Sequence, residues 1–122
     1  SPAIQISLDL LEENAKLVFH DPKVSKEQIK EVILRGQKDE SNDEKYINKK
    51  LFFEKDIYQA VVDADAIILI TDWNDYINLN WSRISKLMRK PSWVFDTRAI
   101  LDSETVRKEG INLWQLGEGS FV

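Results

Sequence analysis

The chain has 122 residues and a mass of 14.2 kDa, which suffices for one hydrophobic core but would leave each of two cores marginal. Its composition is 43% hydrophobic and 31% charged, as in ordinary globular proteins. The net charge of −4 argues against nucleic acid or anionic membranes as partners, and the longest apolar run, 66–70, is far too short to span a bilayer. We therefore expect a single cytoplasmic domain over residues 1–122.

Several classes of chemistry are excluded by residue types that are rare or missing. The chain has no cysteine and one histidine, which removes disulfides, thiolate metal sites and thiol nucleophiles. Its four glycines form neither a dinucleotide fingerprint nor a phosphate loop. We therefore expect this chain by itself to hold no metal, no cofactor and no catalytic residue. Because it begins with Ser and no leader-like segment follows, we also expect it to be a piece of something longer.

The first half of the chain alternates between helical and extended patterns. Apolar residues at helical spacing predict a helix from the start to near residue 14, and a strand follows over 15–20. A capping box predicts a helix over 25–36. The segment 37–50 is highly charged and without apolar periodicity, so we expect a solvated loop there.

The next elements are a short strand over 51–53, a helix over 57–64 and a strand over 66–70. The last of these shows no polar alternation, which is typical of a strand that helices cover on both faces.

Three further elements complete the chain. Asn80 is placed to cap a helix that Pro91 ends, and 93–95 forms the next strand. Asp102 caps another helix, which ends at Gly110, and 111–116 forms the last strand. Strands separated by helices require crossover connections. The fold class is therefore α/β, a three-layer α/β/α Rossmann-like arrangement around a mostly parallel sheet of about five strands.

Ligands of such folds bind beyond the carboxyl ends of the strands. The residues at those positions are 20–22, Glu54, 71–73, 96–98 and 117–118. Among them, Arg98 is the natural anion contact, because its planar fork of donors suits phosphate or carboxylate. The alternative is that Arg98 forms a structural salt bridge with Asp96 or with an acid at a neighbouring strand end.

Two other groups at these positions have a functional and a structural interpretation. Thr71 and Asp72 offer a hydroxyl and a carboxylate beside the stacking surface of Trp73, which would line a pocket. Alternatively, Asp72 caps the following turn and Trp73 packs on the core. His20 with Asp21 is either a metal pair or general base, or a satisfied surface group.

The order of several short motifs resembles a known family. The segments are 1–4 (Ser-Pro-Ala-Ile), 21–24 (Asp-Pro-Lys-Val), 63–66 (Asp-Ala-Asp-Ala), 71–73 (Thr-Asp-Trp), 95–98 (Phe-Asp-Thr-Arg) and 101–102 (Leu-Asp). Together they resemble the C-terminal UDP-binding domain of the UDP-glucose/GDP-mannose dehydrogenase family, over essentially the whole chain. The resemblance implies that the chain is one domain of an NAD-dependent UDP-glucose 6-dehydrogenase. In such enzymes other domains bind NAD and supply the catalytic cysteine that oxidises UDP-glucose to UDP-glucuronate, so the domain alone should be inactive.

Carried over residue by residue, the resemblance implies a substrate-binding set and no catalytic residue in this chain. Arg98 matches the arginine that approaches the nucleotide sugar, within the motif that also contains Asp96. Thr71, Asp72 and Trp73 match a stretch near the nucleotide. Ala99 departs from the pattern, because relatives often carry Asn or Arg there.

The resemblance also implies that the family's first strand lies upstream of this chain in the sequence. In the folded sheet of the family, that strand is expected between the strands 15–20 and 66–70. We therefore expect those two strands to pair directly, or to exchange strands with another copy in a homo-oligomer, because unpaired backbone groups are costly. The other implied partners are a UDP-sugar and the remaining domains of the enzyme.

Two alternatives stay open. The chain would also suit a free-standing nucleotide-binding or protein-interaction module without catalysis. A phosphoacceptor signalling domain ranks lower, because such domains carry a Lys-Pro pair after their last strand, whereas Lys90-Pro91 precedes the strand at 93.

Overall fold

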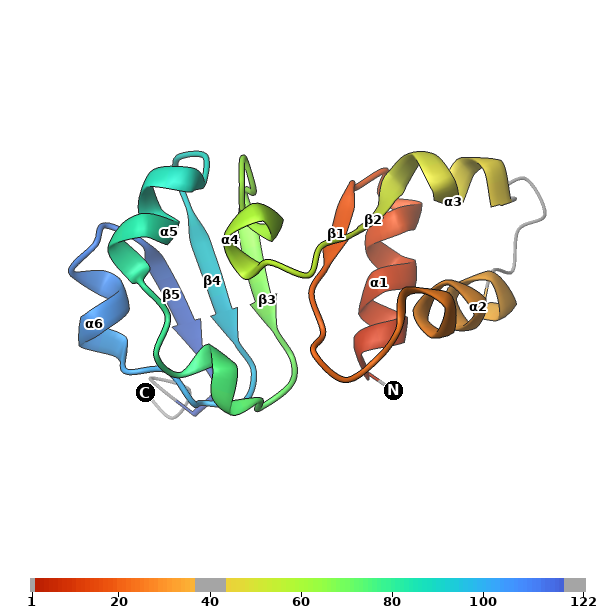
Figure 1. Cartoon of the computed structure of the whole chain (residues 1–122). Helices are drawn as coiled ribbons and strands as arrows, with labels where there is room; N and C mark the ends of the chain where they lie inside the picture. Colours follow the sequence, from red (N-terminus) through yellow and green to blue (C-terminus); the bar gives the residue numbers. More distant parts are fainter. Residues whose placement is uncertain (1, 37–43, 118–122) are drawn as a thin grey trace. The chain divides into compact units, whose positions relative to one another are not determined.

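The computed structural model describes residues 2–36 and 44–117. The chain divides into two compact units, Ser1–Ala60 and Val61–Val122, each with a sheet of its own (Figure 1). Within the described ranges, no helix is both long and apolar enough to cross a membrane.

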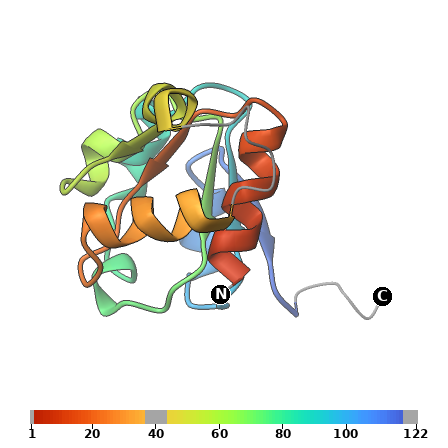
Figure 2. The ribbon, with the colours of Figure 1, turned by 90° about the vertical axis from the view of Figure 1, so that its right-hand side faces the viewer.

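The first unit contains two parallel strands and the helices that pack on them. Its elements are α1 (Pro2–Glu12), β1 (Leu17–Phe19), α2 (Lys26–Gly36), α3 (Glu44–Lys50), β2 (Leu51–Phe53) and α4 (Ile57–Ala60). Strand β1 pairs with β2, and Leu17 lies opposite Leu51. Helices α1 and α2 lie against each other in the unit (Figure 2), with Leu11 and Ile33 fully or almost fully buried. The predicted helices and strands at 1–36 and 51–53 are thereby confirmed for the described residues.

The capping box at the start of α2 forms as the sequence predicts. The backbone amide of Gln28 donates to Ser25 Oγ at 3.2 Å, and the amide of Ser25 donates to Gln28 Oε1 at 2.9 Å. At the other end of this helix, a Cβ atom on Gly36 would come within 2.7 Å of Leu8 Cδ1. The missing side chain therefore allows α1 and α2 to approach closely.

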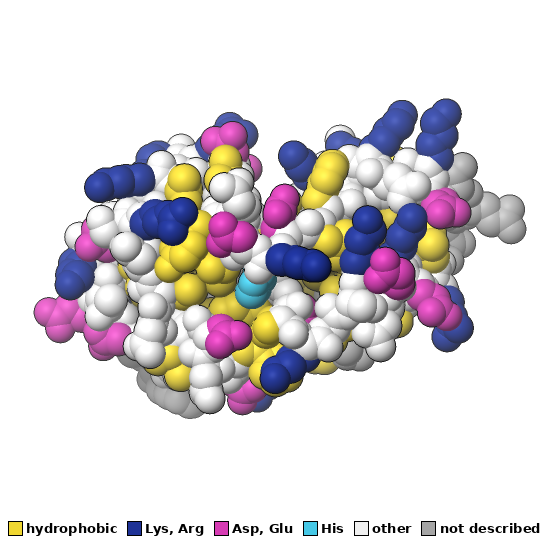
Figure 3. All heavy atoms as spheres, viewed as in Figure 1, with side chains coloured by type: hydrophobic (Ala, Val, Ile, Leu, Met, Phe, Trp, Pro, Cys, Tyr) yellow, Lys and Arg dark blue, Asp and Glu magenta, His cyan; other side chains and the backbone are white. Residues whose placement is uncertain are grey.

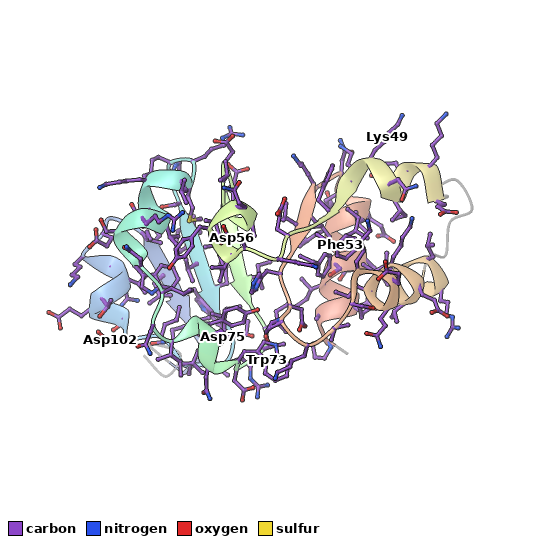
Figure 4. The ribbon with its side chains drawn as sticks, viewed as in Figure 1. Lys49, Phe53, Asp56, Trp73, Asp75 and Asp102 are labelled. Carbon is purple, nitrogen blue, oxygen red and sulfur yellow. The ribbon has the colours of Figure 1, made fainter. Side chains whose placement is uncertain are left out.

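The expectation of a loop over 37–50 is wrong for residues 44–50, which form α3; residues 37–43 lie outside the described part. Ile47 is fully buried in the core, and the hydroxyl of Tyr46 donates to the carbonyl oxygen of Leu11 at 3.0 Å. Lysine side chains of the same helix, Lys49 among them, project into solvent (Figures 3 and 4). One buried apolar residue on a charged helix gives no visible periodicity, although it is enough to dock the helix.

Helix α4 is shorter than the predicted 57–64. The carboxylate of Asp56 caps its start by accepting from the amide of Tyr58 at 3.0 Å. Asp63 adopts a φ of 59°, a left-handed conformation that cannot continue a helix.

The second unit is built on three parallel strands in the order β3-β4-β5. Its elements are β3 (Ala66–Leu69), the 3-10 turn η1 (Asn74–Tyr76), α5 (Trp81–Leu87), β4 (Trp93–Asp96), α6 (Ser103–Arg107) and β5 (Asn112–Gln115). The side chain of Asn80 accepts from the amide of Arg83 and that of Asp102 from the amide of Thr105, as expected of caps. Gly110 follows α6 with a φ of 79°.

The two faces of this sheet differ in burial. Leu69, Val94 and Leu113 are buried on the face toward which the crossover helices turn. The opposite face carries Trp93 and Trp114, whose side chains are 40% and 44% exposed. Helices α5 and α6 account for one face of the sheet, and the remaining described helices belong to the first unit. That helices cover the strand 66–70 on both faces therefore stays a prediction.

The fold class is confirmed: all five strands form, and every observed strand pair is parallel. The strands are nevertheless divided between a two-stranded and a three-stranded sheet rather than joined in one. Strand β1 belongs to the first unit and β3 to the second, so direct pairing of these two strands stays a prediction. Exchange of a strand between copies stays a prediction.

Candidate functional site

The carboxyl ends of the three strands in the second unit meet at one edge, where Leu69, Asp96 and Gln115 lie side by side in register. Figure 4 shows that Trp73 and Asp102 lie at this same edge, toward which the strand arrows point. The loops that follow β3 and β4 therefore bring together the predicted site residues of this unit.

Arg98 and Asp72 form an ion pair at this edge. Arg98 Nη2 lies 3.3 Å from Asp72 Oδ2, and the two side chains are 50% and 60% exposed. Thus Arg98 does pair with an acid at a neighbouring strand end, which was the structural alternative. An exposed pair of this kind contributes at most about 1 kcal/mol. The guanidinium therefore remains available to a stronger anion such as a phosphate.

Asp96 is placed differently from the other predicted site residues, because it is fully buried. Its Oδ1 accepts from the amide of Arg98 at 3.1 Å. Its Oδ2 accepts from the amide of Leu101 and from Gln115 Nε2, both at 2.9 Å. Direct contact with a ligand would require Asp96 to give up these bonds inside the protein, which is costly for a carboxylate.

Thr71 and Trp73 flank Asp72 and are both partly buried. The carbonyl oxygen of Trp73 accepts from the amide of Tyr76 at 3.1 Å at the start of η1. The residue before this turn, Trp73, provides no side-chain cap, and the carboxylate of Asp72 is directed to Arg98. Asp72 therefore faces the same side of the edge as the candidate anion contact.

The predicted pair in the first unit has local partners. His20 Nε2 lies 3.1 Å from the carbonyl oxygen of Lys55, an acceptor. Asp21 Oδ1 accepts from the amides of Lys23 and Val24 at 2.8 and 3.1 Å, which fixes the turn after β1. Across the described ranges, no three His, Cys, Asp or Glu residues gather closely enough to hold a metal ion. These contacts favour the structural interpretation of both residues.

Thr97 and Gln115 also hold this edge together, although neither was assigned a role from the sequence; Thr97 was expected only as part of the strand-end segment 96–98. Thr97 Oγ1 and its amide both donate to the carbonyl oxygen of Leu69, at 2.8 and 3.1 Å, which ties the loop after β4 to β3. Gln115 Nε2 donates to Asp96 and also to the carbonyl oxygen of Leu101 at 2.7 Å. For Gln115 a signal was available, because it is a polar residue at a position of the strand that the apolar alternation assigns to the buried face. For Thr97 the only signal was its position between Asp96 and Arg98.

The N-terminus of α6 lies at the same edge. The hydroxyl and the amide of Thr105 both donate to the carboxylate of Asp102, and these bonds lower the pKa of that carboxyl. Lys108 lowers the same pKa further through its charge. Asp102 is therefore engaged in capping.

The described glycines do not fit the phosphates of NAD. Gly36 packs against Leu8, while Gly110 and Gly117 occupy single left-handed turn positions with φ values of 79° and 85°. A phosphate loop needs several backbone amides directed at one anion between a strand and a helix. No step is therefore assigned to NAD on this chain.

Comparison with known proteins shows the family of the domain that carries this edge. The family model for the UDP-glucose/GDP-mannose dehydrogenase family, UDP binding domain, matches residues 1–103, which include all five predicted substrate-binding residues. The chain belongs to the UDP-glucose/GDP-mannose dehydrogenase family. It corresponds to the UDP-binding domain of that family.

Individual relatives of the dehydrogenase family agree with this assignment. The chain is 34% identical over 116 residues to UDP-glucose 6-dehydrogenase of Drosophila melanogaster, covering 95% of the chain and 24% of the relative. It is 33% identical over 117 residues to the Caenorhabditis elegans enzyme, covering 96% and 23%. It is 37% identical over 102 residues to the Gallus gallus enzyme, covering 84% and 20%. The chain thus spans about a quarter of the length of these relatives.

Proposed function

We propose that residues 1–122 act as one domain that binds the UDP end of a nucleotide sugar, with UDP-glucose as the substrate, in an NAD-dependent UDP-glucose 6-dehydrogenase. The other domains of that enzyme bind NAD and oxidise UDP-glucose to UDP-glucuronate. This chain contributes recognition of the nucleotide and closure over it.

The observation that carries the proposal is the half-exposed guanidinium of Arg98 at the carboxyl edge of β3-β4-β5. A pyrophosphate carries more charge than the carboxylate of Asp72, and it offers oxygens for bidentate contact. We assign the pyrophosphate to Arg98. Thr71 and Asp72 serve as polar contacts for hydroxyl groups of the ligand, and Trp73 serves as an apolar wall.

The test is calorimetric titration of UDP and UDP-glucose into the intact natural polypeptide that contains this chain, for wild type and Arg98→Ala. We expect Arg98→Ala to weaken UDP binding about tenfold or more, as the loss of a charged hydrogen-bonding partner does. The matched control is Arg89→Ala, because Arg89 is also an exposed arginine that is paired with an acid. Its Nε lies 3.5 Å from Oδ1 of Asp65, the residue that precedes β3. UDP affinity should not change in the control.

Three results would contradict the proposal or its parts. Equal UDP affinity in wild type and Arg98→Ala removes Arg98 from the site. Equally weakened UDP binding in Arg89→Ala would show that the loss reflects the net charge of the protein and not a contact made by Arg98. Firm UDP binding without any UDP-glucose-dependent reduction of NAD would favour a nucleotide-binding module without catalysis.

A further inference from the structure

Asp96 is a carboxylate in the interior of the second unit that the proposed contact with pyrophosphate does not use. It is fully buried, and none of the ion pairs found among the described residues includes it. Burial of a carboxylate is tolerated only where hydrogen bonds replace water. All three groups bonded to Asp96 are N–H donors, two from the backbone and one from Gln115.

The three donors are arranged around the loop that carries Arg98. The amides of Arg98 and Leu101 mark the two ends of a short turn, and both bind the same carboxylate. Between them, Ala99 adopts a φ of 56°, a left-handed conformation that an alanine disfavours by about 1–2 kcal/mol. The carboxylate therefore holds closed a turn that this sequence does not favour by itself.

Neighbouring strands fix the same loop from both sides. Gln115 on β5 binds Asp96 and the carbonyl oxygen of Leu101 with one amide group. Thr97 binds the carbonyl oxygen of Leu69 at the end of β3. The backbone on either side of Arg98 is thus anchored to all three strands, while the Arg98 side chain itself stays half exposed.

We propose that Asp96, supported by Gln115, is a positioning residue that sets the backbone of Arg98 so that its guanidinium reaches the ligand anion. This inference rests on the proposed role of Arg98. Displacement of a contact group by about 1 Å is enough to lose much of its benefit, so removal of the buried carboxylate weakens ligand binding without any contact to the ligand.

The test is a double-mutant cycle between Asp96→Asn and Arg98→Ala, read out as UDP affinity by calorimetry in the intact natural polypeptide. Asparagine keeps the size of the side chain but turns one acceptor oxygen into a donor that faces N–H groups. We expect Asp96→Asn to weaken UDP binding about tenfold, and we expect little further loss when it is added to Arg98→Ala.

Two further variants separate positioning from general loss of stability. Val106→Ala removes methyl groups from a fully buried site on α6 that is not part of the Arg98 loop, so it should destabilise the unit and leave the UDP affinity of folded protein within twofold. Gln115→Ala removes a single donor to Asp96 and serves where Asp96→Asn does not fold. We expect it to give a smaller loss of UDP affinity that also disappears in the Arg98→Ala background.

The outcomes distinguish this inference from the proposed function. If Arg98→Ala leaves UDP affinity unchanged, the proposed role of Arg98 fails and the positioning role fails with it; if wild type does not bind UDP at all, the proposed function itself fails. If Arg98→Ala weakens binding while Asp96→Asn and Gln115→Ala do not, only the positioning role is overturned. Losses that multiply in the double variants would also overturn it, because Asp96 would then act independently of Arg98.

Discussion

Arg98 Nη2 and Asp72 Oδ2 lie 3.3 Å apart, in loops that follow two adjacent parallel strands. The pair brings a cation and an acid into the same candidate anion site. Asp72 therefore opposes a phosphate by charge while it offers an acceptor to hydroxyl groups. These two effects are separable with ligands that have only one of the two features.

Asp72→Asn should strengthen binding of inorganic pyrophosphate by about two- to fivefold, because an exposed ion pair and its competing charge are worth up to ~1 kcal/mol. UDP-glucose, which also carries hydroxyl groups, should gain less. Calorimetric titration of both ligands measures the difference. Asp75→Asn is the control, since Asp75 is an exposed acid of η1 at the same edge. Unchanged pyrophosphate affinity in Asp72→Asn, or an equal gain in the control, would contradict the prediction.

Ser92→Ala should raise the free energy of unfolding by about 1 kcal/mol, because a buried hydroxyl without a partner is costly. Ser92 is fully buried, and its Oγ finds no hydrogen-bond partner among the described residues. Ser85→Ala should have the opposite sign, a loss of about 1–2 kcal/mol, because Ser85 Oγ donates to the carbonyl oxygen of Glu109 and accepts from Lys90. Urea unfolding of the two variants checks this, and changes of the same sign would refute it.

Protonation of Asp102 should lower the free energy of unfolding of the second unit at acidic pH. Its pKa in the folded protein is lowered, first by the hydroxyl and then by the amide of Thr105. The carboxylate therefore stabilises the folded state fully at pH values above its unfolded pKa, and this contribution is lost as the pH falls through the lower pKa of the folded state. Asp102→Ala should lower the urea midpoint at pH 7, and its difference from wild type should shrink at more acidic pH.

Asp102→Asn separates capping from titration in that experiment, because asparagine is an equally good cap but carries no charge. On acidification, wild type should lose stability relative to Asp102→Asn, because the carboxylate is protonated while the asparagine cap does not titrate. A gap between wild type and Asp102→Ala that stays constant down to the most acidic pH measured would show that Asp102 does not titrate in this way.

Most elements could be predicted because their signals are local. The capping box at Ser25 and Gln28, the caps Asn80 and Asp102, and the apolar run of β3 each specify a boundary or an element by themselves. Helix α3 could not be predicted, because a single buried side chain, Ile47, docks it on a core made by distant residues.

The candidate site was predictable in position more than in detail. That strand ends converge on one edge follows from a parallel sheet, so Arg98 and Asp72 were expected near each other. Whether a carboxylate contacts solvent or holds its own loop depends on where neighbouring strands place their donors. The burial of Asp96 and its bond to Gln115 are therefore properties of the assembled sheet.

Both crossover helices of the second unit belong to one side of its sheet, and the other side keeps Trp93 and Trp114 partly in water. Two partly exposed tryptophans on one face of a sheet form an apolar surface through which copies of the chain can associate. At high concentration, the isolated chain should therefore aggregate under conditions in which it is still folded.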